Sequence, residues 1–193
     1  MGLVGLELLT EGKMGFREIS PAEIRGNMID RIGREWMLVT AAKDGSRKGD
    51  ACGSTYNTMT ASWGGVGVLW GKPVAFVFIR PERYTYSFAE ASDYMTLSFF
   101  GEDKRPALAF CGSKSGRDVD KALECSLTPV FTEEDGGTSV YFGEARLVLT
   151  LRKLYASPIE ESGFIDKECL AFYENSGFHK AYVGEIERVL VRE

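Results

Sequence analysis

Short apolar segments broken by turn residues recur along the chain, and they predict strands rather than long helices. Residues 36–42 and 51–56 are rich in apolar and β-branched side chains, and a turn near Asp44-Gly45 separates them. Residues 73–79 are apolar throughout, which predicts a strand buried on both faces. Further strands are expected at residues 64–70, 94–100, 130–132, 139–154 and 181–191.

Helix signals are fewer. Ser20, Pro21 and Glu23 supply an N-cap, a proline for the first helical position and an early acidic residue, so a helix is expected from Pro21 to about Arg31. Short helices are also expected at residues 82–90 and 106–110. About eight strands without regular alternation of strand and helix favour a closed, mostly antiparallel β-barrel with peripheral helices over a doubly wound sheet.

The 193 residues suit one domain with a substantial core. Met14-Gly15-Phe16 restarts the chain just before the first convincing element. We therefore expect a single domain over residues 14–193 and a possible flexible extension over residues 1–13.

Charge excludes some classes of partner. The chain has 28 acidic and 23 basic residues, and its formal charge of −5 opposes wide contact with nucleic acid or anionic lipid. No apolar run approaches the roughly 20 residues of a membrane span, and Glu7 and Glu11 stand where a signal peptide would be basic. We expect a cytoplasmic protein with no nucleic-acid or membrane partner, in which any anion site is local.

Metal binding is not expected. Cys52, Cys111, Cys125 and Cys169 are scattered without a C-x-x-C pair, and His179 is the single histidine. These are too few ligands in too loose a spacing for a zinc pattern, so reduced thiols are expected.

Three polar clusters, at residues 57–64, 80–85 and 111–121, do not fit a core. They combine small hydroxyl residues, glycines and the pair Arg80 and Arg83, which together offer the charge, donors and close backbone approach that a bound phosphate needs. Each cluster alone also suits a solvated loop or surface arginines paired to glutamates. Their recurrence favours a phosphorylated cofactor.

The glycines of residues 64–71 do not supply that site by a nucleotide fingerprint. Trp70 stands where G-x-G-x-x-G requires its last glycine, and Val66 stands where a P-loop requires its first. Bulge or turn glycines explain this run better.

Together, the three clusters resemble the motifs of the flavin reductase-like, FMN-binding split-barrel family, in particular its flavoredoxin-like branch, over residues 14–191. The matching stretches read Asn57-x-Met59-Thr60-Ala61-Ser62-Trp63-Gly64, Arg80-Pro81-x-Arg83-Tyr84-Thr85 and Ser115-Gly116-Arg117-Asp118-x-Asp120-Lys121.

The resemblance implies an antiparallel, Greek-key split barrel that forms a homodimer and holds FMN near the subunit interface, with electrons from NAD(P)H or a protein donor. It also implies roles for three sets of residues. Those lining the isoalloxazine and ribityl would be Asn57, Met59, Thr60, Ala61, Ser62 and Trp63; those facing the phosphate would be Arg80, Arg83 and Thr85; those closing the site would be Ser115, Gly116 and Lys121.

His179 lies in a stretch that resembles the place where relatives hold a histidine near the flavin. With an unperturbed pKa of about 6.5 it could donate or relay a proton, or orient a nicotinamide, and the alternative is a structural histidine. Cys111 is either redox-active or, as its type favours, a small buried hydrophobe.

The function that the resemblance implies is an FMN oxidoreductase that passes electrons from NAD(P)H or a protein donor through FMN to an acceptor, and we expect NAD(P)H dependence. The alternatives are a non-enzymatic FMN electron carrier that serves partner proteins and a flavin-binding module without turnover. No nicotinamide fingerprint or partner surface is visible in the sequence, so it does not decide between them.

Overall fold

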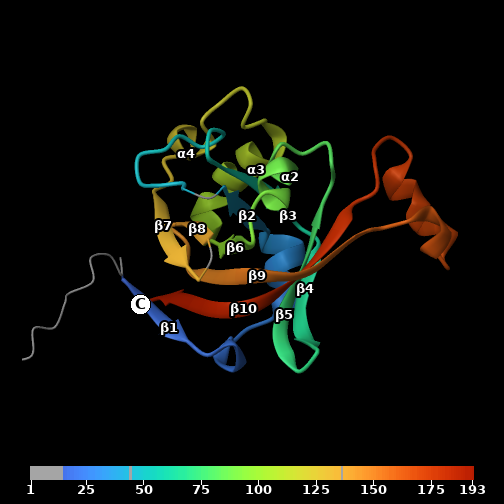
Figure 1. Ribbon diagram of the computed structural model, residues 1–193, viewed down its shortest axis with the longest axis horizontal. Helices are drawn as coiled ribbons and strands as arrows, with labels where there is room; N and C mark the ends of the chain where they lie inside the picture. Colours follow the sequence, from blue (N-terminus) through green and yellow to red (C-terminus); the bar gives the residue numbers. More distant parts are fainter. Residues whose placement is uncertain (1–14, 44, 136) are drawn as a thin grey trace, which may run out of the picture.

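Antiparallel strands build the body of the protein in the computed structural model, which describes residues 15–43, 45–135 and 137–193 (Figure 1). The strands are β1 (Phe16–Ile19), β2 (Met37–Ala42), β3 (Tyr56–Ala61), β4 (Gly64–Leu69), β5 (Lys72–Ile79), β6 (Tyr94–Phe99), β7 (Pro129–Glu134), β8 (Gly137–Phe142), β9 (Leu147–Pro158) and β10 (Lys180–Arg192). The extension expected over residues 1–13 lies outside the described residues.

Helical segments are short and lie around the strands. They are η1 (Pro21–Glu23), α1 (Met28–Asp30), η2 (Arg31–Glu35), α2 (Thr85–Glu90), η3 (Glu102–Lys104), α3 (Arg105–Ser113), α4 (Lys121–Glu124), η4 (Glu161–Gly163) and η5 (Lys167–Tyr173). Among them, none is both long and apolar enough to span a membrane.

The main sheet has the order β3-β2-β6-β9-β10-β5-β4, with β1 paired to β10, and β7 and β8 form a separate hairpin. Its ladders are antiparallel, which confirms the expected strand arrangement. The two outermost strands, β3 and β4, follow one another along the chain and are joined by Ser62 and Trp63. The sheet therefore coils until its two edges meet at this two-residue link.

The expected closure of the barrel by hydrogen bonds is not found within the described part of the chain, because β3 and β4 share no ladder there. The backbone turns sharply at Gly64, whose φ is +152°, and β4 then pairs with β5 instead. A Cβ at Gly64 would lie 2.7 Å from the carbonyl oxygen of Phe76, so only glycine allows this close pairing. The barrel is thus split at the Ser62–Trp63 link.

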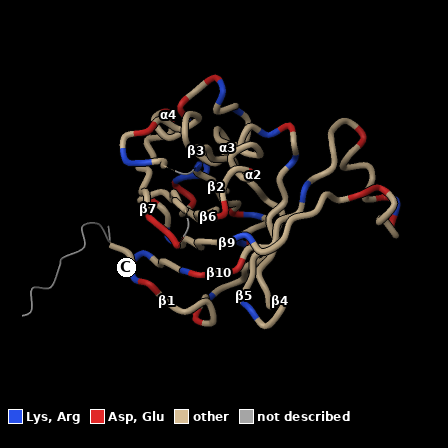
Figure 2. The backbone as a smooth tube through the Cα atoms, in the orientation of Figure 1, with Lys and Arg blue, Asp and Glu red and all other residues tan. Residues whose placement is uncertain are grey.

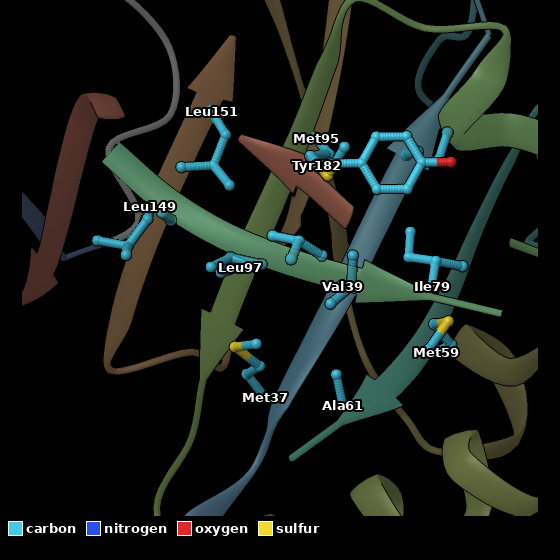
Figure 3. Packing of buried hydrophobic residues seen from close by; sticks show 14 of the residues in the cluster. Met37, Val39, Met59, Ala61, Ile79, Met95, Leu97, Leu149, Leu151 and Tyr182 are labelled. Carbon is cyan, nitrogen blue, oxygen red and sulfur yellow. The ribbon is translucent and has the colours of Figure 1, made fainter. Parts of the chain in front are cut away.

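The coiled sheet encloses one apolar cluster and carries a second on its outer face. Val39, Leu97 and Leu149 lie in the enclosed cluster, as do the other side chains labelled in Figure 3. Leu38, the neighbour of Val39, points to the outer cluster under β7, β8 and α3. Each fully buried side chain of this size contributes roughly 1.5–3 kcal/mol to stability.

A strand buried on both faces was expected at residues 73–79, and this prediction is wrong. Instead, β2 and β6 are the strands in which every residue is buried. β5 instead alternates, with Val77 and Ile79 buried and Phe76 and Phe78 half-buried. The reason is that the hairpin and α3 cover β2 and β6, whereas β5 has a face that borders a cavity.

The prediction of one helix from Pro21 to about Arg31 is wrong. Ser20 is the N-cap as expected, and it forms a capping box with Glu23 in which the Ser20 amide donates to the Glu23 carboxylate at 2.8 Å. Ile24 then leaves the helical region and Gly26 takes a φ of +97°, so the first turn ends and Asn27 caps a new one.

Three other boundaries also differ from expectation. Residues 51–56 form turns with a single bridge from Cys52 to Tyr56, so that residues 57–61 belong to the body of β3. Residues 139–154 are divided between β8 and β9 by a turn, and α2 begins only at Thr85. Long-range pairing of β3 with β2 decides the first of these differences.

An arm of residues 159–179 connects β9 to β10 and projects from the body, at the right of Figure 1. Its last residues return to the sheet next to the end of β5. Acidic and basic residues are interspersed over body and arm alike (Figure 2).

Candidate functional site

Two adjoining cavities form the candidate site, and the Ser62–Trp63 link lines the larger one. The larger, of about 470 Å³, has a mixed apolar and polar lining: Met59, Thr60, Ala61, Ser62, Trp63, Phe78, Arg80, Glu82, Arg83, Asn175, Ser176 and His179. The smaller, of about 160 Å³, is lined by hydroxyl and cationic residues: Glu82, Arg83, Tyr84, Thr85, Ser113, Lys114, Ser115, Arg117 and Lys121. Glu82 and Arg83 line both, so the cavities are neighbours. The larger suits a flat ring with polar edges, and the smaller suits an anion.

Arg83 lies at the junction of the two cavities and is half-buried. Burial, and then the charge of Arg80, lower the pKa of its guanidinium. No ion pair or side-chain hydrogen bond joins this guanidinium to any residue that the structure describes. Because Arg83 lines both cavities, its donors are available to an anion bound there.

Arg80 has a different environment, although it is only three residues away. Its Nε donates to Nε2 of His179 at 3.3 Å, its Nη2 donates to the carbonyl oxygen of Phe172 at 3.0 Å, and its Nη1 donates to Oγ of Ser176. Arg80 thus holds the arm against the end of β5. It lines the larger cavity but not the smaller one, whereas the resemblance groups it with Arg83 and Thr85, which line the smaller cavity.

Asn57 and Gly116 lie behind the cavities rather than in them. Asn57 is fully buried, and its Nδ2 donates to Oγ1 of Thr85 at 2.8 Å, which ties β3 to the first turn of α2. Gly116 packs so closely on this amide that a Cβ would lie 2.1 Å from Oδ1 of Asn57. Both residues hold Thr85 and the loop at Ser115 in place.

Lys121 has a buried ammonium group at the wall of the smaller cavity. Its Nζ donates to the carbonyl oxygens of Thr58 at 2.8 Å and Cys111 at 3.0 Å, and burial lowers its pKa. Lysine has three N–H donors, so one remains after these two bonds. Lys121 therefore joins β3, α3 and α4 and retains a donor for a ligand.

His179 lies in the larger cavity with both ring nitrogens engaged. Because Arg80 can only donate, Nε2 of His179 is the acceptor, so the proton is on Nδ1, which donates to Oη of Tyr173 at 3.1 Å. Burial, followed by the charge of Arg80, lowers the pKa of His179 to about 4. The expectation of an unperturbed pKa is therefore wrong, and the imidazole is neutral at neutral pH.

Some residues at this site carry no signal in the sequence. Asn175 and Ser176 belong to the arm and line the cavity, and Tyr173 contacts His179 from the arm. Arg80, about a hundred positions earlier, helps to hold the arm there. Phe78 was included in an apolar strand, but the alternation of β5 turns it towards the cavity.

The cysteines are thiols, and Cys111 is buried as a small hydrophobe would be. Its Sγ lies 3.9 Å from Sγ of Cys125, and burial raises the pKa of both groups. Cys52 is also buried, which raises its pKa to about 11. Within the described ranges, no cluster of histidine, cysteine and carboxylate residues could hold a metal ion.

A comparison with protein families identifies the domain. The family model described as flavin reductase like domain matches residues 29–193. The chain belongs to the flavin reductase-like family. This confirms the resemblance carried by the three polar clusters.

Solved structures agree with this family. Flavoredoxin of Desulfovibrio vulgaris (Miyazaki F) is 25% identical, with 82% of this chain and 69% of that chain covered and a TM-score of 0.59. An FMN-binding domain of a flavin reductases-like enzyme from Shewanella baltica OS155 is 15% identical, covers 92% of this chain and 77% of its own, and has a TM-score of 0.60.

A third structure is an NADH:FAD oxidoreductase, SgcE6, from Streptomyces globisporus C-1027, in complex with NAD and FAD fragments. It is 17% identical, with 82% of this chain and 74% of that chain covered and a TM-score of 0.54. Below 25% identity, the likeness of the last two structures concerns the fold. No curated protein matches the chain.

Proposed function

We propose that the protein is an FMN-binding oxidoreductase that passes electrons from NAD(P)H through the flavin to an acceptor. The observation that carries this proposal is the half-buried guanidinium of Arg83, which lacks a partner among the described residues and stands between a ring-sized cavity and an anion-sized cavity. A flavin mononucleotide has a ring and a phosphate in that arrangement, so the residues present fit the group.

The phosphate is assigned to the smaller cavity, where Arg83, Thr85, Ser115 and Lys121 offer two charges and two hydroxyls. Thr85 is the first residue of α2 and lines this cavity. Charge and hydrogen bonds together select a phosphorylated flavin over an uncharged one.

The ring is assigned to the larger cavity, along residues 59–63. Thr60 and Ser62 bring hydroxyls and backbone groups to its polar edge, while Met59 and Trp63 contribute apolar surface. Thr60 is held by its own bond, with Oγ1 donating to the carbonyl oxygen of Leu108. When bound, the flavin supplies hydride and electron transfer, and the protein supplies orientation and electrostatics.

His179 is assigned to orient this site as a neutral side chain. It joins Arg80 to Tyr173, and its ring lies 5.2 Å from that of Trp63 at the mouth of the larger cavity. A proton relay through His179 stays a prediction, and so do contacts of Asn57, Arg80 and Gly116 with the flavin.

A non-enzymatic electron carrier is the second candidate, because flavoredoxin of D. vulgaris has the highest identity of the three structures compared above. Anaerobic mixing with NADH or NADPH separates the two functions. We expect the added nucleotide to reduce the bound flavin, so that the flavin absorbance of the FMN-loaded protein decreases after mixing. A flavin that stays oxidised with both nucleotides but accepts electrons from a reduced redox protein would contradict the reductase and support the carrier.

We also propose that two copies of the chain pair at this site. Trp63 and Phe172 are 41% and 60% exposed and pack edge to face at 5.4 Å beside the larger cavity. Exposed aromatics rimmed by polar residues are typical of interfaces. Sedimentation at the mass of a single 21.4 kDa chain in the presence of FMN would contradict the pairing. A cytoplasmic location also stays a prediction.

The neutral state of His179 predicts a dependence of stability on pH. The pKa is about 4 in the folded protein and about 6.5 in the unfolded chain, so between these values only the unfolded chain binds the proton. Stability from this group is complete above about pH 6.5 and is lost as the pH falls to about 4. We expect the melting temperature of the wild type to drop more between pH 7 and pH 5 than that of His179→Gln. Equal drops would show that the imidazole is not held neutral.

A further inference from the structure

A third cavity, of about 440 Å³, lies away from the candidate flavin site. Four arginines from separate segments line it: Arg17 of β1, Arg25 after η1, Arg31 of η2 and Arg146 before β9. Apolar side chains of β1, β9 and β10 also line it. The cavity reaches Val191, near the end of β10, whereas the larger flavin cavity includes His179, just before β10 begins. The two sites are therefore at opposite ends of this long strand.

The positive charge of this cavity is poorly compensated. Glu23 is the one acidic residue in its lining, and its carboxylate already accepts the Ser20 amide of the capping box. Arg146 pairs with Glu35, yet its Nε is buried and finds no hydrogen-bond partner among the described residues. Arg17, Arg25 and Arg31 form no ion pair with any residue in the described ranges.

Clustering of these cations is unfavourable in the absence of an anion. Burial, followed by the neighbouring charge of Arg146, lowers the pKa of Arg31, and the carboxylate of Glu35 opposes this shift only in part. The chain as a whole carries a formal charge of −5, so a general excess of basic residues does not explain the cluster.

Local backbone geometry holds Arg31 in this position. A Cβ at Gly26 would lie 2.9 Å from Nη2 of Arg31, and the φ of +97° at Gly26 is one that glycine adopts readily. On either side of this glycine, the Ser20 capping box and the Asn27 cap fix the loop. The guanidinium is thus packed against a defined turn instead of extending into solvent.

We propose that this cavity is a binding site for a phosphorylated small organic molecule, with its phosphate or pyrophosphate group on the four guanidiniums and its organic part on the apolar lining. The planar fork of donors in arginine matches phosphate oxygens in pairs, and a dianion relieves the repulsion between Arg31 and Arg146. The site is independent of the proposed flavin chemistry, since it shares no lining residue with either flavin cavity.

Isothermal titration of the full-length, FMN-loaded protein with inorganic pyrophosphate tests the proposal. We expect one saturable site whose affinity falls about tenfold or more in Arg17→Gln and in Arg31→Gln, because each removes charge-assisted hydrogen bonds. Arg47→Gln is the matched control, because Arg47 is exposed and lines none of these cavities, and its affinity should equal that of the wild type. Melting temperatures of all variants establish that they are folded.

Arg83→Ala separates this site from the flavin site. It removes the cation proposed to hold the flavin phosphate, so pyrophosphate affinity at the arginine cavity should be unchanged in this variant even if it no longer holds FMN. The proposal is overturned by the absence of saturable binding at 10 mM pyrophosphate, by equal affinities in the wild type and folded Arg31→Gln, or by loss of binding in Arg83→Ala.

Discussion

Arg83→Ala is expected to weaken FMN binding about 10- to 100-fold while leaving riboflavin binding almost unchanged. Its guanidinium is half-buried at the smaller cavity and is not engaged by other described residues, so its donors are available to the phosphate. A charge-assisted hydrogen bond contributes roughly 1.5–3 kcal/mol, which corresponds to this change in affinity. Riboflavin lacks the phosphate and so does not gain from this contact.

Fluorescence titration of the apoprotein with each flavin measures both affinities. Arg47→Ala, on the exposed loop before β3, is the control for loss of a positive charge elsewhere. Arg80→Ala is the informative comparison, because the donors of Arg80 are bound to Phe172, Ser176 and His179. Arg80→Ala should therefore change the preference for FMN over riboflavin less than Arg83→Ala does. A similar loss of FMN and riboflavin affinity in Arg83→Ala would exclude the assigned phosphate contact.

Gly116→Ala is expected to destabilise the protein by about 2–4 kcal/mol and to abolish most FMN binding. The added methyl would lie 2.1 Å from Oδ1 of the buried Asn57, so the amide or the loop must shift, and a shift of the amide strains its bond to Thr85. Overpacking combined with a broken buried hydrogen bond has an effect of this size. The carbonyl of Gly116 also packs on Gly53, which takes a φ of +100°.

Gly163→Ala is the matched control, since nothing lies within 4 Å of a Cβ built at that position of the arm. Urea unfolding of both variants, with FMN titration of the folded fraction, measures the two effects. If Gly116→Ala unfolds at the same urea concentration as Gly163→Ala, the loop around Ser115 is not packed on Asn57 as the structure has it.

Local signals in the sequence were reliable where a few neighbouring residues decide the outcome. Ser20 is the expected N-cap, and with Glu23 it completes a capping box, since their side chains reach backbone amides within the same turn. The apolar segments become antiparallel strands because their side chains need a common core. The end of the first helix was not predicted. The turn that begins after Ser20 ends early because the backbone is extended at Ile24 and Gly26 has a positive φ.

The candidate site was predicted in its segments but not in its detailed roles. Residues 59–63 and 83–85, together with Ser115 and Lys121, do line two adjoining cavities. Arg80 and Arg83 looked equivalent in the sequence. In the structure, Arg80 holds the arm, whereas Arg83 lines both cavities. The difference arises from Ser176 and His179, which are distant from Arg80 in sequence and meet it only after β10 pairs with β5.

By itself, the sequence determined the antiparallel β class, the family and the segments that line the two cavities, because these depend on local composition and on the order of the motifs along the chain. Only the tertiary structure decided where the barrel splits, which arginine has unoccupied donors and that His179 is neutral. Each of these depends on contacts between residues far apart along the chain, where burial and neighbouring charge fix the orientation of a donor and the pKa of an imidazole.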